Sequence, residues 1–200
     1  MGASDVEAQI SIPKMEAPEV ETPEILKDDT DYSRLSEREE KELRIDKLFE
    51  KLAVEEESEQ GALIAEEISA LWSRSGSASV DLLLQRGTQA LNVGDLKLAR
   101  KMFNHVTYLE PNFAEGWARS GSLAFVEDDL ERAVSDFTQT LIFEPRHIYA
   151  LGGLGAILEK LGRVDQAYEV FSESYRLYPS EPTIKRKYEA LSGAADGSVL

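Results

Sequence analysis

Apolar residues recur at helical spacing along most of the chain. A charged, helix-forming stretch from Arg34 leads into an apolar stripe that ends at Leu52. Gly61 interrupts the pattern, and a second apolar stripe ends at Trp72. The serine-rich segment 73–79 that follows is typical of a loop. The pattern therefore predicts two helices before this loop.

Four residue types repeat three times at an interval of 34 residues. The sets are Gly87, Gly121 and Gly155; Ala99, Ala133 and Ala167; Phe103, Phe137 and Phe171; and Pro111, Pro145 and Pro179. Glycine and alanine permit two helices to approach closely, phenylalanine fills the space between them, and proline ends the second helix. Turn signals lie midway through each interval, at Gly94-Asp95, Asp128-Asp129 and Gly162-Arg163. The interval predicts three helix–turn–helix units with Phe137 in the core. Asp128 is expected on an exposed turn, where replacement by Ala should have little effect on the protein.

This pattern resembles the tetratricopeptide repeat (TPR) family, whose motif places Gly, Ala, Phe and Pro at such spacings. Trp117 occupies the family's tryptophan position in the second unit. The resemblance implies an all-α fold, a TPR-type α-solenoid of three repeats at 80–113, 114–147 and 148–181. Stacked helix pairs of this kind form a curved surface that binds other proteins.

The residues before the first repeat keep part of the same register. We expect N-terminal helices over 34–79. Phe49, Ala53 and Ala65 each lie 34 residues before a repeat position, which favours a degenerate repeat over 46–79. The phenylalanine and proline of the motif are both replaced by serine in that segment.

The two ends of the chain differ from the repeats in composition. Residues 1–33 contain nine acidic and two basic residues with three prolines, which predicts a disordered acidic arm. A partner-binding strip is the alternative for this segment. Residues 182–200 are expected to form a capping helix that starts at 182 and a frayed tail from Gly193.

Composition excludes several classes of function. The chain has 22 Lys and Arg against 38 Asp and Glu, a formal net charge of −16, which argues against nucleic acid as a partner. It has no cysteine and two histidines, so neither a thiolate nor a multi-histidine metal site is expected. No run of about 18 apolar residues occurs, so direct membrane insertion is not expected.

No catalytic or cofactor-binding constellation is recognisable. Gly152-Gly153-Leu154-Gly155 resembles a phosphate loop, but no Lys-Ser or Lys-Thr follows it and no strand precedes it. His147 directly precedes the third unit and is interpreted as a capping or packing residue. We therefore expect no enzyme activity, no cofactor and no metal.

Local strings extend the resemblance. Residues 75–87, 113–117 and 144–155 are similar to alphaproteobacterial periplasmic TPR proteins linked to cell-envelope integrity. That resemblance implies a periplasmic protein. The first six residues, Met-Gly-Ala-Ser-Asp-Val, lack the basic and apolar regions of a signal peptide, which leaves a cytoplasmic location open.

By family position, one residue stripe on the first helix of each unit lines a concave peptide-binding groove. The stripe comprises Leu84, Thr88 and Leu91; Glu115, Arg119, Ser122 and Phe125; and Tyr149, Gly152, Gly153 and Ala156. Two interpretations stay open: these residues bind a peptide or protein partner, or they pack against the N-terminal helices folded into the groove. Only Arg119 is basic among the corresponding positions of chaperone-binding TPR domains, so no chaperone carboxylate clamp is expected.

The predicted function is a non-enzymatic protein-interaction scaffold that supports the bacterial envelope. The alternative is a cytosolic secretion chaperone of the small acidic TPR type, which holds an unfolded client.

Overall fold

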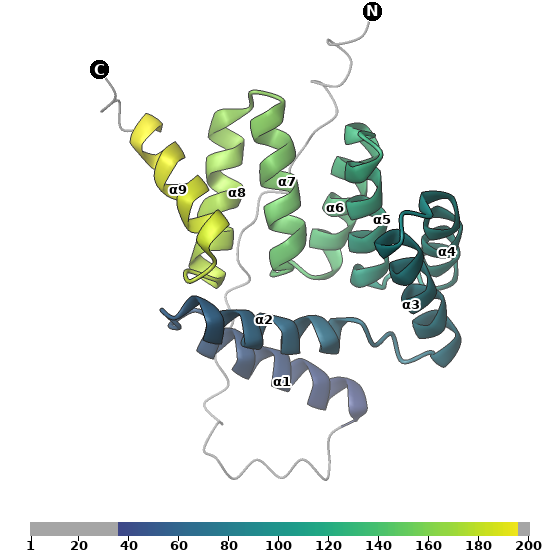
Figure 1. Ribbon diagram of the computed structural model, residues 1–200. Helices are drawn as coiled ribbons and strands as arrows, with labels where there is room; N and C mark the ends of the chain where they lie inside the picture. The colour runs from purple at the N-terminus through teal and green to yellow at the C-terminus, as the bar shows by residue number, and fades with distance from the viewer. Residues whose placement is uncertain (1–35, 196–200) are drawn as a thin grey trace, which may run out of the picture.

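The computed structural model describes residues 36–195, and every regular element within that range is an α-helix. Figure 1 shows the helices as upright pairs above one crosswise pair. The helices are α1 (Glu37–Leu52), α2 (Ser58–Trp72), α3 (Ala78–Asn92), α4 (Leu96–Leu109), α5 (Ala114–Val126), α6 (Leu130–Phe143), α7 (Ile148–Lys160), α8 (Val164–Leu177) and α9 (Pro182–Ala195). The predicted all-α solenoid is confirmed.

Three antiparallel hairpins, α3/α4, α5/α6 and α7/α8, form the repeat array and stack in chain order. The repeated glycines explain how closely each hairpin packs. A Cβ atom on Gly87, Gly121 or Gly155 would lie 2.5, 2.9 or 2.8 Å from the phenylalanine ring of the same repeat. No side chain fits at that distance, so glycine is required wherever the ring fills the hairpin.

Phe137 illustrates how neighbouring repeats are joined. Its side chain is buried, as predicted, and its ring lies against Gly121 within its own hairpin. A Cβ on Gly153 of α7 would lie 2.6 Å from the other side of the same ring. One aromatic ring therefore holds α5, α6 and α7 together.

In each hairpin turn, a residue with left-handed backbone conformation directly precedes the N-cap residue of the second helix. Gly94 and Gly162 have φ angles of +79° and +72°, and Asp128 takes the equivalent place with φ +60°. The next residue caps the second helix in two of the repeats: Asp95 accepts a hydrogen bond from the Leu98 amide and Asp129 from the Arg132 amide. The midway turn signals in the sequence thus correspond to the observed turns.

The α1–α2 hairpin does not stack on α3 as a fourth repeat. It lies across the lower ends of the upright helices, beneath α7 and α8 in Figure 1. Ala53, which matches the mid-helix Gly87 by register, is the C-cap of α1. The interpretation of 46–79 as a degenerate repeat is therefore wrong, because the first helix ends where that register requires its middle.

At the other end, α9 packs on α8 through stacked tyrosines. The ring of Tyr188 lies 4.6 Å from that of Tyr175 and 5.8 Å from that of Tyr168, centroid to centroid. The helix continues to Ala195, so the expectation that it ends before Gly193 is wrong, and the tail expected beyond it lies outside the described residues. The predicted acidic arm, 1–33, lies outside the described residues.

Buried apolar side chains form two clusters. One joins α1 and α2 to the α6, α7 and α8 helices, and the other joins α3 and α4 to α5. Within residues 36–195, no helix combines the length and the apolar character needed to cross a membrane.

Candidate binding pocket on the first-helix face

The first helices of the three repeats, α3, α5 and α7, form what we call the first-helix face. A pocket of about 290 Å³ opens on this face where α2 approaches α5 and the start of α7. Its lining residues are Glu66 and Ser69 of α2; Glu115, Ala118, Arg119 and Ser122 of α5; and His147 and Tyr149. Helix α2 therefore forms one wall of the pocket.

A buried carboxylate organises the floor of the pocket. Glu115 Oε1 accepts a hydrogen bond from Arg119 Nε at 2.7 Å and lies 2.6 Å from Arg119 Nη2. Its second oxygen, Oε2, lies 2.9 Å from His147 Nε2. Both oxygens of Glu115 are thus engaged within the protein.

His147 caps α7 and is buried, as its place before the third repeat predicted. Its Nδ1 accepts a hydrogen bond from the Ala150 amide at 3.2 Å, so that nitrogen carries no proton. The hydrogen bonds therefore assign the single ring proton to Nε2, which donates to Glu115, and the ring is neutral. The face of the His147 ring stacks on the Trp72 ring of α2, with the ring centroids 4.3 Å apart.

The environment of Glu115 keeps its carboxyl ionised. Burial by itself raises the pKa of this group, because removing water disfavours the charged form. The hydrogen bond from His147 and the electrostatic attraction of His147 and Arg119, with the hydrogen bond from Arg119, outweigh burial and hold the pKa of Glu115 below its usual value. Glu115 and Arg119 are consequently a neutral pair.

Contacts from α1 and the α6–α7 turn hold the crosswise hairpin against this site. Arg146 Nη1 donates to Asp46 Oδ1 at 2.7 Å, and the Arg146 guanidinium lies 4.8 Å from the centre of the Phe49 ring. Trp72 Nε1 donates to Glu144 Oε2 at 3.3 Å. The turn before α7 therefore contacts both N-terminal helices.

The structure distributes the expected groove residues over three environments. Glu115, Arg119, Ser122 and Tyr149 meet at the pocket, and Phe125 is exposed one turn beyond Ser122 on α5.

The remaining residues of the stripe lie away from the pocket. Leu84 belongs to the buried cluster of the first repeat, with Leu91 packed against it, and the Thr88 hydroxyl donates to the Leu84 carbonyl. Gly152 faces Ile184 of α9, and Ala156 is half-buried.

Leu84 and Gly153 are used for internal packing and do not line an open groove. Leu84 is buried between α3, α4 and α5 because its side chain is needed in the core of a first repeat that has no hairpin stacked on its outer side. Gly153 touches Phe137, so it serves the packing of α6 on α7. We correct the sequence expectation for these two residues.

Sequence reasoning missed the α2 contribution of Glu66 and Ser69. Both residues lie outside the repeats, and nothing in the 34-residue interval indicates that α2 folds back onto α5. The spacing of apolar residues predicted the α2 helix, but it carried no signal for the surface on which α2 packs.

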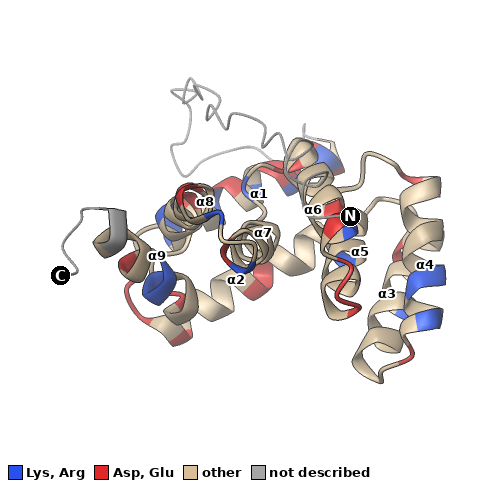
Figure 2. Ribbon diagram, turned by 90° about the horizontal axis from the view of Figure 1, so that it is seen from above, with Lys and Arg blue, Asp and Glu red and all other residues tan. Residues whose placement is uncertain are grey.

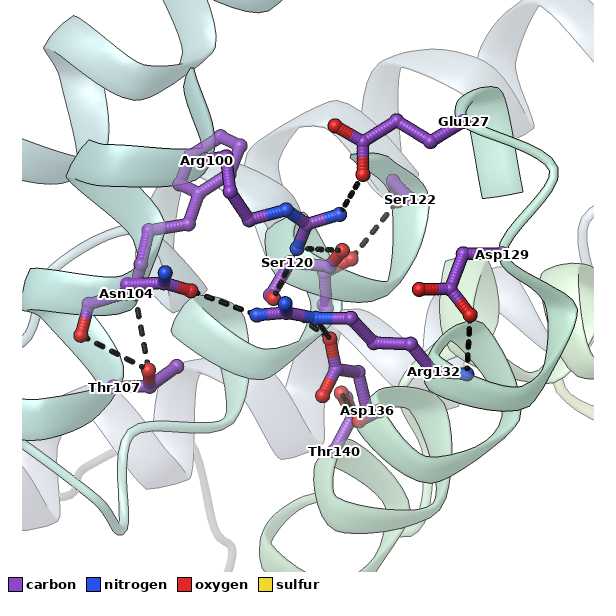
Figure 3. Close-up of polar contacts among 12 residues, drawn as sticks. Arg100, Asn104, Thr107, Ser120, Ser122, Glu127, Asp129, Arg132, Asp136 and Thr140 are labelled. Carbon is purple, nitrogen blue, oxygen red and sulfur yellow. Dashed lines mark hydrogen bonds and ion pairs between the residues drawn. The ribbon is translucent and has the colours of Figure 1, made fainter. Parts of the chain in front are cut away.

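A second polar cluster joins the first two repeats at α4, α5 and α6 (Figure 3). Arg100 Nη1 donates to Ser120 Oγ at 3.0 Å, and Ser120 Oγ donates to Asp136 Oδ2 at 2.7 Å. Arg100 also pairs with Glu127, and Arg132 Nη2 donates to Asn104 Oδ1 at 2.7 Å. Burial raises the pKa of Asp136, and the Ser120 hydroxyl with Arg132 and Arg100 offsets part of that effect.

This second cluster is structural in character. Its donors and acceptors are paired with one another across the repeat boundary. The described part of the chain also brings no three metal-ligating side chains together.

Stacked helical hairpins with a pocket on the first-helix face define an α-solenoid repeat protein. A TPR repeat-containing protein of Rhizobium etli is 31% identical over 155 residues, which cover 78% of this chain and 76% of that relative. The chain therefore belongs to the tetratricopeptide repeat proteins. No family model matches it.

Solved structures agree on the fold. The first TPR domain of Spaghetti (RPAP3), bound to an HSP90 peptide, matches 58% of this chain and 93% of that one, with a TM-score of 0.55 and 16% identity. MamA AMB-1 matches 80% of this chain and 84% of that one, with a TM-score of 0.52 and 19% identity. The second match is the more extensive one along this chain.

Proposed function

We propose that this protein is a non-enzymatic scaffold that binds a peptide or protein segment on its first-helix face. One observation carries the proposal: Phe125 and Tyr149 remain 40% and 51% exposed beside the pocket. Exposed aromatic side chains next to a pocket provide a large apolar contact area for a partner. Membership of the TPR proteins and the peptide held by the Spaghetti TPR domain support the same conclusion.

The mechanism is presentation of a preformed surface. Glu115, Ser122 and Phe125 lie on one face of α5, so a segment that follows this helix reaches from the pocket to the exposed ring. The pocket floor is held by internal hydrogen bonds, which reduces the ordering that binding requires.

The variant Phe125→Glu tests this function. Short random peptides displayed on phage are selected against the wild-type protein, and the selected peptides are then tested on the variant. We expect the variant to lose binding, because a carboxylate replaces the apolar contact, while its melting temperature stays unchanged. Peptides that bind both proteins equally would contradict the proposal, whereas a large fall in melting temperature would favour self-packing of the N-terminal helices against Phe125.

We further propose that the protein works in the bacterial periplasm and supports envelope integrity, on the strength of the local strings 75–87 and 144–155. Cell fractionation and the detergent sensitivity of a deletion strain test this. A cytosolic protein that suppresses aggregation of an insoluble client would instead be the secretion chaperone, which the exposed ring of Phe125 would also suit.

A further inference from the structure

The charges of the pocket do not balance. Glu115 has both oxygens engaged by Arg119 and His147, and the His147 ring is neutral. These three residues therefore contribute no net charge. The remaining charged group in the lining is the carboxylate of Glu66, so the pocket carries one negative charge.

Glu66 is available to a partner. It lies on the exposed side of α2, and its carboxylate forms no hydrogen bond or ion pair with any residue from 36 to 195. The only charged residues of α2 are the acids Glu59, Glu66 and Glu67, and Glu67 pairs with Arg44 of α1. Figure 2 shows acidic residues on α2 beneath α7, whereas basic residues gather on α4 and α9.

Aromatic side chains complete the walls around this carboxylate. Tyr149 presents a half-exposed ring at the pocket, and His147 approaches that ring edge-on with centroids 6.2 Å apart. A cation gains attraction when it lies over the face of a tyrosine ring within about 6 Å. The pocket, at about 290 Å³, is at the lower limit of small-molecule sites, so its size suits one side chain.

We infer that the pocket receives a lysine or arginine side chain of the bound segment, with its cationic group between the Glu66 carboxylate and the Tyr149 ring. Apolar residues of the same segment then lie along α5 on Phe125. This inference rests on the proposed function and adds the chemistry of the partner. It describes a partner segment that is basic and apolar, complementary to a chain with a net charge of −16.

An acidic group fits the pocket less well. Arg119 directs Nε and Nη2 to Glu115, so an anion would have to compete with a carboxylate that is already in place. An anion would also meet the unneutralised charge of Glu66. Both contacts favour a cation over a C-terminal carboxylate.

The displayed random peptides that depend on Phe125 provide the test. We expect these peptides to be enriched in Lys or Arg at one position. A synthetic copy of the most enriched peptide should bind Glu66→Gln about 3–10-fold more weakly than wild type in fluorescence anisotropy. Glu59→Gln, which removes a charge from the same helix outside the pocket, is the matched control and should bind as wild type does.

A charge reversal sharpens the result. Selection against Glu66→Lys should enrich Asp or Glu at the position that carried the basic residue. Replacing that basic residue of the synthetic peptide with norleucine should weaken binding to the wild type more than binding to Glu66→Gln, in which only the contact of the cation with the Tyr149 ring is left to lose.

Each other outcome overturns the inference. Peptides that need Phe125 but show no basic residue, or an acidic one, would leave the proposed function standing and refute the cationic pocket. If no selected peptide depends on Phe125, the proposed function fails, and the partner chemistry built on it fails too.

Discussion

At the scale of single residues, the three repeats provide internal comparisons. The turn before each second helix has the same backbone geometry, with φ and ψ of −82° and 72° at Asp95, −85° and 75° at Asp129, and −85° and 64° at Arg163. The two aspartates cap their helices, but Arg163 makes no side-chain cap. Its Nη1 is also buried without a hydrogen-bond partner among the described residues.

Arg163→Asp should therefore stabilise the protein. An aspartate in this geometry supplies the missing acceptor and suits the positive end of the helix dipole, for a gain of about 1 kcal/mol. In thermal denaturation the melting temperature should rise by roughly 2–4 °C. Arg163→Ala removes the guanidinium without adding a cap, so the difference between the two variants isolates the cap itself. Equal melting temperatures for the two would contradict the argument.

Asp128 tests the left-handed position of the turn. The sequence suggested a tolerant exposed site, but φ is +60° there, and a residue with a Cβ pays about 1–2 kcal/mol for that conformation unless its side chain compensates locally. We therefore expect Asp128→Ala to lower the free energy of unfolding by about 1 kcal/mol. Asp128→Gly, which restores the residue found at 94 and 162, should stay within about 0.5 kcal/mol of wild type in urea denaturation. A neutral alanine variant would show that the turn is not strained.

Glu115 makes a prediction about pH. Its pKa is lower in the folded protein than in the unfolded chain, so its contribution to stability is present above the ordinary glutamate pKa and is lost as the pH falls through the folded value. Glu115→Gln should be less stable than wild type at pH 7. The difference in stability between the two proteins should decrease as the pH is lowered below about 4. Melting temperatures across this range measure it. A difference in melting temperature that is constant with pH would mean that the charge of the Glu115 carboxylate does not contribute to stability.

The residues of the site differ in how far the sequence could predict them. Glu115, Arg119, Ser122 and Tyr149 were reached because family position places them on one helix face. Leu84 shares that position, but it is buried. The sequence could not predict this burial, because position within a repeat does not reveal which repeat must complete its own core.

At the scale of helices, the repeated phenylalanine is the main packing element. Phe137 touches glycines of both α5 and α7, so its loss opens a cavity within one hairpin and between two repeats. Phe137→Ala should lower the free energy of unfolding by about 3–5 kcal/mol in chemical denaturation. Ile142→Ala, at an exposed position of the same helix, should change it by less than about 0.5 kcal/mol. Similar losses for the two variants would contradict the assigned packing.

Apolar spacing and the 34-residue interval predicted the helices themselves, but they did not predict where α1 and α2 pack on the repeats. Periodicity reports that a helix has an apolar face and not which surface covers it. The contacts that settle the matter, such as Asp46 with Arg146, join residues 100 positions apart.

At the scale of the whole molecule, Trp72 links the crosswise hairpin to the repeats. It is buried, stacks on His147 and donates to Glu144. Trp72→Ala should lower the free energy of unfolding by about 3–5 kcal/mol and release the hairpin, so that proteases cut the 73–77 loop faster. Leu63→Ala, exposed on the same helix, is the control. Unchanged cleavage of the loop in Trp72→Ala would show that the hairpin is held elsewhere.

The crosswise hairpin also affects the order of events during synthesis. Helices α1 and α2 leave the ribosome before the repeats, but the side chain to which Trp72 donates, that of Glu144, is 72 residues further on. At about 5–20 residues per second, the nascent hairpin waits roughly 4–14 s with the face that will cover α7 still uncovered. During that interval its apolar residues, including Ile64, Ile68 and Trp72, are open to chaperones and to neighbouring nascent chains. Synthesis of the α6–α7 turn and of α7 therefore sets the earliest time at which the apolar face of α2 can be covered.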